Sequence, residues 1–379
     1  MPVSEQEEGV AQRSDGADSS RMFNFSAGPA VLPLPVLRQA QSDLLALPGV
    51  GSSVLEISHR SAAFDTILEE TLATLRHLLS VGEDHELILL QGGASLQFSM
   101  IPMNLLRGHG SADYILTGSW GNAALKEALR EGDARIVWDG KDNNYSCLPR
   151  IEELNVSSDS AYVHLTSNET IQGVQWKQVP DVGDAPLICD CSSDFLSRPI
   201  DVSKYGLLYA CAQKNAGIAG VTVVVIRKDL LHRCGDALPK MMNYQTYVKN
   251  GSRPNTPPVF AVYILGLVCR WIQESMGGLS MLAQQNASKA QLLYDVIDKS
   301  DGFYAGHAHA SCRSDMNVTF RLGDETREKQ FVEKAAEHGL VDLKGHRSVG
   351  GIRASIYNAM PLKGVETLRQ FMLDFQQSH

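Results

Sequence analysis

Residues 207–228, LLYACAQKNAGIAGVTVVVIRK, contain two apolar runs of strand length that flank a short loop of small residues. One lysine, Lys214, lies in that loop. A lysine is seldom fully buried unless another group pairs with it or uses it. A lysine between two buried strands is therefore a candidate functional residue.

The rest of the chain repeats this strand pattern. Apolar runs alternate with helical patterns, which is typical of an α/β fold with a mostly parallel sheet covered by helices on both faces. The candidate strands are ELILL (86–90), DYILT (113–117), YVHLT (162–166), PLICD (186–190), GLLYAC (206–211) and VTVVVI (221–226). All but the last run into small or polar residues. Because ligands bind beyond the carboxyl ends of the strands in such sheets, we predict that these ends form one site that includes Lys214.

We expect four parts along the chain. Residues 1–21 are polar and acidic and are predicted to be disordered. An N-terminal arm (22–33), a large domain (34–272) and a smaller α+β C-terminal domain (273–379) follow. The run VFAVYILGLVCRWIQES (259–275) predicts one long helix that joins the two domains.

Composition excludes several classes of protein. A net charge of −9 argues against a general surface for nucleic acid or anionic membranes. No apolar run approaches the length of about 20 residues that spans a bilayer, and the N-terminus lacks the pattern of a signal peptide. Seven cysteines without a C-x-x-C pair indicate a reducing compartment and no zinc or other metal site. We expect a soluble, cytoplasmic protein.

The segment LILLQGGASLQFSM (87–100) indicates a phosphate-binding turn. It predicts a strand, a tight glycine turn and then a helix, which directs free backbone N–H groups at whatever lies above Ala94 and Ser95. Neither the Walker loop nor the dinucleotide fingerprint is present. A tight turn without any ligand is the alternative interpretation of this segment alone.

Asp190 ends an apolar strand, where an unpaired carboxylate is costly unless a donor or cation meets it. Pyridoxal phosphate needs an aspartate at its ring nitrogen and a lysine at its aldehyde. Trp120, at another strand end, would supply an aromatic face for the ring. A solvated aspartate, a lysine that reaches the surface and a core tryptophan are the structural alternatives, but three such residues on successive strand ends favour the cofactor.

Taken together, these stretches resemble the phosphoserine aminotransferases, a branch of the class V, fold-type I pyridoxal-phosphate enzymes. The similarity extends from about Phe23 to about Leu373. The stretches that carry it are FNFSAGPAVLP, EISHRS, GGASLQF, SNETIQGV, SSDFLSRPIDVSKYG, AQKN, NTPP and GHRSVGGIRASIYNAM.

The resemblance implies roles for the residues around the cofactor. Lys214 would form the Schiff base and act as general base, Asp190 would face the pyridine nitrogen, and Trp120 would stack on the ring. The other implied contacts are Thr170 near the 3-hydroxyl, Ala94, Ser95 and Gln213 at the phosphate, and Asn255 and Thr256 from the second subunit of a homodimer with shared active sites.

The resemblance also implies the substrates. The pair His59 and Arg60 would form half of a pocket for the substrate phosphate, the pair His346 and Arg347 the other half, and Arg353 would bind the substrate α-carboxylate. Arginine offers a planar fork of donors that matches phosphate and carboxylate oxygens. The implied reaction is a ping-pong transfer of an amino group between glutamate/2-oxoglutarate and 3-phosphohydroxypyruvate/O-phosphoserine, a step of serine biosynthesis.

The chain departs from the usual family pattern at Gly121-Asn122-Ala123 and at Ile218. Three alternatives stay open: an alanine–glyoxylate type aminotransferase, a cysteine desulfurase, and a catalytically silent binder of a sugar phosphate or nucleotide. A desulfurase needs a mobile nucleophilic cysteine, for which Cys312 in HAHASCRSDMN is the candidate.

Overall fold

The computed structural model of the chain describes residues 21–379, so the predicted disordered tail lies outside the described residues except for its last one. A seven-stranded sheet has the order β2-β10-β9-β8-β5-β3-β4. Its strands are β2 (His85–Leu90), β3 (Ser111–Leu116), β4 (Asp133–Asp139), β5 (Val163–Thr166), β8 (Leu187–Asp190), β9 (Leu207–Cys211) and β10 (Thr222–Arg227). The predicted α/β fold with a mostly parallel sheet is confirmed.

One strand runs against the others. β10 pairs antiparallel with both β2 and β9, whereas the remaining neighbours pair in parallel. The carboxyl end of β10 therefore lies at the opposite edge of the sheet from the other carboxyl ends. This explains why the segment after VTVVVI lacks the small and polar residues that follow the other strands.

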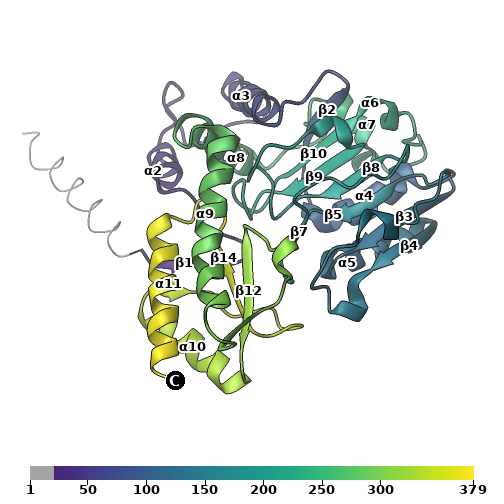
Figure 1. Ribbon diagram of the computed structural model, residues 1–379. Coiled ribbons are helices and arrows are strands. Elements are labelled where there is room, and N and C mark those ends of the chain that lie inside the picture. Colours follow the sequence, from purple (N-terminus) through teal and green to yellow (C-terminus); the bar gives the residue numbers. More distant parts are fainter. Residues whose placement is uncertain (1–20) are drawn as a thin grey trace, which may run out of the picture.

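Helices cover both faces of this sheet (Figure 1). Alternate residues of β2 enter different cores: Leu87 and Leu89 pack with α3 (Ala62–Leu79) and α8 (Val259–Glu274), while Ile88 and Leu90 pack with α4 (Gly93–Leu105) and α5 (Ser119–Glu131). A strand buried on both faces needs a continuous apolar run, which is why such runs predicted the central strands.

A second, three-stranded antiparallel sheet of order β11-β12-β14 forms the C-terminal part. Its strands are β11 (Tyr304–Gly306), β12 (Asn317–Leu322) and β14 (Ile352–Ser355), and its helices are α9 (Gly278–Asp298), α10 (Glu325–Glu337) and α11 (Leu362–Gln377). In the arm, β1 (Phe23–Asn24) pairs in parallel with β13 (Leu340–Val341). The arm thus joins the C-terminal part, as Figure 1 shows.

The remaining elements are short. They are α2 (Leu34–Asp43), α6 (Lys228–Leu231), α7 (Tyr244–Lys249), the two-stranded ladder of β6 (Asn168–Glu169) and β7 (Val174–Gln175), and 3₁₀ turns at Gly140–Asn143, Ile151–Glu153, Val202–Lys204, Lys240–Met242 and Ala310–Cys312.

The predicted long helix 259–275 is present as α8, and α9 begins four residues after α8 ends. The boundary at 272/273 falls in the last turn of α8, and the division into two domains stays a prediction. Within residues 21–379, no single helix has the length and apolar content needed to cross a membrane. The pair α8 and α9 passes such a test only jointly, with a bend of 86° between the helices.

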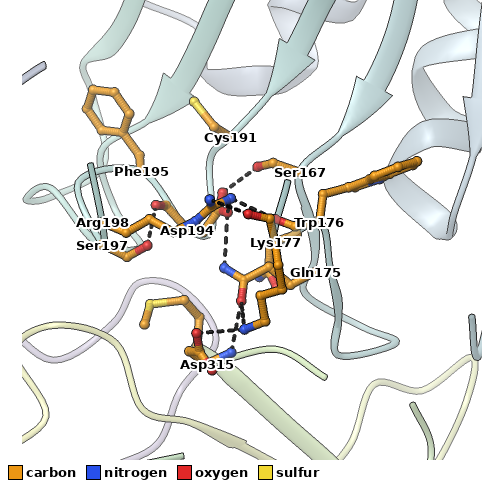
Figure 2. A network of polar contacts seen from close by, with 12 residues as sticks. Ser167, Gln175, Trp176, Lys177, Cys191, Asp194, Phe195, Ser197, Arg198 and Asp315 are labelled. Atoms are coloured by element: carbon orange, nitrogen blue, oxygen red, sulfur yellow. Dashed lines mark hydrogen bonds and ion pairs between the residues drawn. The ribbon is translucent and has the colours of Figure 1, made fainter. Parts of the chain in front are cut away.

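A buried polar network joins the carboxyl edge of the large sheet to the small sheet (Figure 2). The carboxylate of Asp194 accepts hydrogen bonds from Ser167 Oγ and from Gln175 Nε2, the latter at 3.1 Å. Gln175 Oε1 in turn accepts from the backbone N–H of Asp315 at 3.1 Å and from Lys177 Nζ at 2.8 Å. Asp315 leads into β12, so this network fixes the small sheet against the strand ends that carry the candidate site.

Candidate active site

The strand ends bring together the residues predicted to surround the cofactor ring. Asp190 is the last residue of β8, Lys214 follows β9, Thr170 follows β6, and Trp120 lies in the first turn of α5, directly after β3. These segments are neighbours because β9, β8, β5 and β3 are consecutive in the sheet.

Lys214 lies at the centre of this group and is half-buried. Its Nζ donates a hydrogen bond to Thr170 Oγ1 at 2.7 Å and lies 5.2 Å from the centroid of the Trp120 ring. The N-terminal arm crosses close by: a Cβ on Gly28, whose φ is +146°, would lie 3.3 Å from Lys214 Cγ. The Ala30 N–H also donates to Gln213 O at 2.9 Å, so the arm holds the loop that carries the lysine.

Asp190 is 4% exposed. Its Oδ1 accepts the Ser192 N–H at 2.9 Å, and no lysine or arginine among residues 21–379 forms an ion pair with it. Burial raises the pKa of the Asp190 carboxyl, and the charge of Lys214 opposes that rise. This buried carboxylate without an ion-pair partner suits a cationic donor such as a protonated ring nitrogen.

The start of α4 offers backbone donors. Gly92 has φ +94° and Gly93 has φ +68°, and a Cβ on Gly92 would lie 2.4 Å from Leu96 Cδ2. The helix has no side-chain cap and no acidic residue in its first turn. The N–H groups of Gly93, Ala94 and Ser95 have no backbone acceptor in the described chain, which suits an anionic group such as phosphate.

These donors and acceptors fit pyridoxal phosphate. A lysine amine, a buried carboxylate oxygen, an aromatic face and a helix N-terminus are the groups that hold its aldehyde, ring nitrogen, ring plane and phosphate. The residues with these groups lie at the same edge of the sheet: Lys214 follows β9, Asp190 ends β8, Trp120 follows β3, and the Ala94–Ser95 turn follows β2, which antiparallel β10 separates from β9.

His346, Arg347 and Arg353 form a second basic group, carried by the small sheet. His346 and Arg353 line one cavity, which Ile171 also lines, directly after Thr170. Burial, and after it the charges of Arg353 and Arg347, lower the pKa of His346. No described acidic residue forms an ion pair with Arg347 or Arg353, so their charges are free for an anionic ligand.

His59, Arg60, Asn255 and Thr256 lie elsewhere in the chain. They line a separate cavity of about 410 Å³. Gln91 Nε2, beside the glycine turn, donates to Thr256 O at 2.9 Å. The single chain therefore does not bring the two predicted His-Arg pairs into one cavity.

Two buried residues near the lysine were not predicted from sequence. Asn215 accepts the Asn358 N–H at 2.9 Å and donates to Phe195 O at 2.9 Å, which anchors the Lys214 loop to both sheets. Glu169 accepts backbone N–H groups from Trp120 and Gly121. The sequence marks them only by position, since Asn215 directly follows Lys214 and Glu169 directly precedes Thr170.

The departures from the family pattern have structural roles. Asn122 Nδ2 donates to Gly118 O at 2.8 Å and to Tyr145 Oη at 3.0 Å, which ties the first turn of α5 to a neighbouring loop. Gly121 supplies one of the two amides bound by Glu169. Ile218 packs against the core.

Comparison with known proteins agrees with this fold. Residues 22–368 match the family model Aminotransferase class-V. A phosphoserine aminotransferase of Rhodopirellula baltica is 52% identical over 368 residues, covering 97% of this chain and 98% of that protein. The solved phosphoserine aminotransferase of Bacillus circulans subsp. alkalophilus has 50% identity and a TM-score of 0.92, covering 94% of this chain and 99% of that chain. A pyridoxal-phosphate-bound phosphoserine aminotransferase from Trichomonas vaginalis has 40% identity and a TM-score of 0.89, covering 93% and 100%.

The fold and the site thus define a class V aminotransferase, and the chain belongs to that family. Within it, the near full-length identity of about half of all residues places the chain among the phosphoserine aminotransferases.

Proposed function

We propose that the chain catalyses the phosphoserine aminotransferase reaction. It transfers an amino group between glutamate/2-oxoglutarate and 3-phosphohydroxypyruvate/O-phosphoserine in serine biosynthesis. The observation that carries this conclusion is the convergence of Lys214, Asp190, Trp120 and Thr170 in a chain about half identical to phosphoserine aminotransferases.

When bound, pyridoxal phosphate supplies an aldehyde that condenses with amines and a ring that accepts electrons. Lys214 Nζ would take the proton from the substrate Cα and deliver it to the former aldehyde carbon of the cofactor, and Thr170 Oγ1 orients that amine. The Asp190 carboxylate would hold the ring nitrogen and, as an anion, would keep that nitrogen protonated.

Trp120 supplies the face against which the ring packs, and the first-turn amides of α4 bind the phosphate. Arg353 binds the α-carboxylate shared by all four substrates, and Arg60 and Arg347 bind the phosphate that only two of them carry. Gln213, whose loop the arm holds, contributes a further contact to the cofactor phosphate.

A coupled assay with purified protein and a panel of oxo acids tests this function. We expect 3-phosphohydroxypyruvate to be used at least ~30-fold better than pyruvate or glyoxylate, because an enclosed charged donor left without its phosphate partner costs about 2–5 kcal/mol. Preference for glyoxylate or pyruvate would support the alanine–glyoxylate type instead. A protein that shows no cofactor absorption after incubation with pyridoxal phosphate would support the silent binder.

The structure does not favour the desulfurase alternative. Cys312 is buried in a 3₁₀ turn, and its Sγ donates hydrogen bonds to the carbonyls of Ser146 and His309, both at 3.4 Å. Burial raises the pKa of its thiol. A buried thiol with a raised pKa is a poor nucleophile, because the thiolate is the reactive form.

We propose that the enzyme is a homodimer with shared active sites. The separation of His59, Arg60, Asn255 and Thr256 from the cavity of His346 and Arg353 supports this, because a second subunit can bring the two groups together. A twofold axis places the same surface of each subunit against the other.

Subunit mixing tests the shared site. Lys214→Ala and Arg60→Ala variants are each expected to be impaired, but a heterodimer contains one site with both residues intact. After random mixing at equal amounts, half of the dimers are heterodimers, and each heterodimer has one intact site of its two. About a quarter of all sites should therefore be as in wild type. Activity of the mixture that equals the average of the two variants, or full activity of a monomer in sedimentation, would contradict the proposal.

We also propose a cytoplasmic location. All seven cysteines are free thiols, a state that a reducing compartment maintains. Recovery of the native protein in another cell fraction would contradict this.

A further inference from the structure

Helix α5, which carries Trp120, does not cap its own N-terminus. Its N-cap residue is Gly118, without a side-chain hydrogen bond, and its first turn contains no acidic residue. The cap comes from Glu169 in β6: its Oε2 accepts the Trp120 N–H at 3.0 Å and its Oε1 accepts the Gly121 N–H at 2.9 Å. A carboxylate at this position also interacts favourably with the helix dipole.

The Glu169 carboxylate depends on these two amides. Its side chain is 0% exposed, and burial raises its pKa to about 7 while the two N–H groups oppose the rise. A buried carboxylate is costly unless donors compensate for the lost water. The helix start and the carboxylate therefore stabilise each other.

Two neighbouring residues, Gln172 and Gly118, support the contact between Glu169 and the start of α5. Gln172 Nε2 donates to Ser119 Oγ at 2.9 Å, which adds a second side chain to the cap. A Cβ on Gly118 would lie 2.5 Å from Glu169 Cδ and 2.6 Å from Gln172 Oε1. Glycine at position 118 is thus required for the close approach of both side chains.

The Trp120 ring has no polar tether of its own. Its Nε1 is buried and has no hydrogen-bond partner within the described range 21–379. The orientation of the ring consequently depends on the backbone to which it is attached, and that backbone is held by Glu169. The next residue, Thr170, binds Lys214 Nζ.

We propose that Glu169 is a positioning residue of the active site, which fixes the first turn of α5 and thereby the plane of the Trp120 ring relative to Lys214. Two consecutive residues thus act on the two parts of the site: Glu169 fixes the backbone of Trp120, and Thr170 accepts the hydrogen bond of Lys214 Nζ. This inference rests on the proposed role of Trp120 as the face for the cofactor ring.

The first test measures cofactor binding by the full-length protein. Glu169→Ala is expected to raise the Kd for pyridoxal phosphate at least about tenfold, equal to ~1.4 kcal/mol, and to change the visible circular dichroism of the bound cofactor. Glu169→Gln keeps the volume and one acceptor oxygen and should show a smaller effect of the same kind. We expect kcat to fall, because the ring is misplaced relative to Lys214. The KM for glutamate should stay within about twofold, because Arg353, the proposed ligand of the α-carboxylate, is unchanged.

Glu127→Gln is the matched control, because it removes a half-buried carboxylate from the same helix, two turns beyond Trp120, where it pairs with Arg130 and accepts a hydrogen bond from Ser99 Oγ at 3.4 Å. It should leave cofactor affinity and dichroism as in wild type. If Glu169→Gln lowers only the melting temperature and leaves both cofactor readouts unchanged, the residue is merely structural and the proposal is wrong.

A double-mutant cycle provides a readout that does not involve the cofactor. Gly118→Ala should lower the melting temperature in the wild-type background, because the new Cβ meets Glu169, and should lower it less in the Glu169→Ala background, where Cγ and Cδ are absent. Additive losses would show that Gly118 and Glu169 are not coupled and would overturn the proposed contact.

Trp120→Ala separates this inference from the proposed function. Unchanged cofactor affinity and dichroism in Trp120→Ala would refute the role of Trp120, and with it the basis of the inference. A changed signal in Trp120→Ala together with a wild-type signal in both Glu169 variants would refute the inference alone.

Discussion

Replacing Lys214 by alanine is expected to remove covalent attachment of pyridoxal phosphate and nearly all turnover. The amine that lies 2.7 Å from Thr170 Oγ1 is the proposed attachment point and the proposed general base. General acid–base catalysis alone contributes about 10²–10⁴-fold, so kcat should fall by at least that factor. The cofactor should remain bound non-covalently, since Asp190, Trp120 and the α4 amides are unchanged.

Borohydride reduction followed by peptide mapping measures the attachment directly. Wild type should carry the pyridoxyl label on the peptide that contains Lys214, and Lys214→Ala should carry none. Lys363→Ala is a suitable control, because Lys363 is exposed in the first turn of α11 and has no proposed role in the site. A label on another lysine of the wild-type protein would show that the assignment is wrong.

The sequence predicted those parts of the fold that depend on local pattern. The central strands are buried on both faces, and continuous apolar runs such as TVVVI identify them. β4 was not predicted because it lies at the sheet edge, where its residues DARIVWD are largely exposed and need no apolar run. The antiparallel direction of β10 was not predicted either, because an apolar run does not show whether its strand is parallel or antiparallel to its neighbours.

The candidate site was predictable where a residue type is unusual for its position. Asp190 and Lys214 stood out because a charged residue directly after a buried strand needs a partner. Glu169 did not stand out, because it lies in the polar segment SNET, and its partners, the amides of Trp120 and Gly121, are 49 and 48 residues away in the chain. Backbone amides have no signature in a sequence, so a carboxylate that binds them is found only in the structure.

The two His-Arg pairs show a second limit of sequence pattern. SHRS and GHRS look alike, yet the chain places His59 and Arg60 in one cavity and His346 in another. A pattern that repeats in the sequence does not tell whether its copies meet within one chain or across two subunits. The N-terminal arm shows the same limit: the sequence predicts an arm at 22–33, but only the structure shows that Gly28 passes close to Lys214.

Substrate specificity is expected to depend on arginines that have no acidic partner in residues 21–379. Arg60→Ala or Arg347→Ala should lower kcat/KM for 3-phosphohydroxypyruvate by about 30-fold or more. Arg60 and Arg347 are exposed in the single chain, and the proposed dimer would enclose the phosphate between them. An enclosed phosphate left without one charged donor loses on the order of 2–5 kcal/mol, and each 1.4 kcal/mol is about tenfold. The half-reaction with glutamate, which carries no phosphate, should suffer much less.

Arg353→Ala should instead impair both half-reactions, because every substrate carries the α-carboxylate that Arg353 is proposed to bind. Burial lowers the pKa of Arg353, and the backbone of Arg353 is held in place because its N–H donates to Leu343 O at 2.8 Å. Single-turnover kinetics of each half-reaction separate these effects. Arg130→Ala, an exposed arginine that pairs with Glu127 on α5, should leave both half-reactions as in wild type. Arg60 and Arg347 variants that use the phosphorylated substrate like wild type would place the phosphate pocket elsewhere and favour an alanine-type aminotransferase.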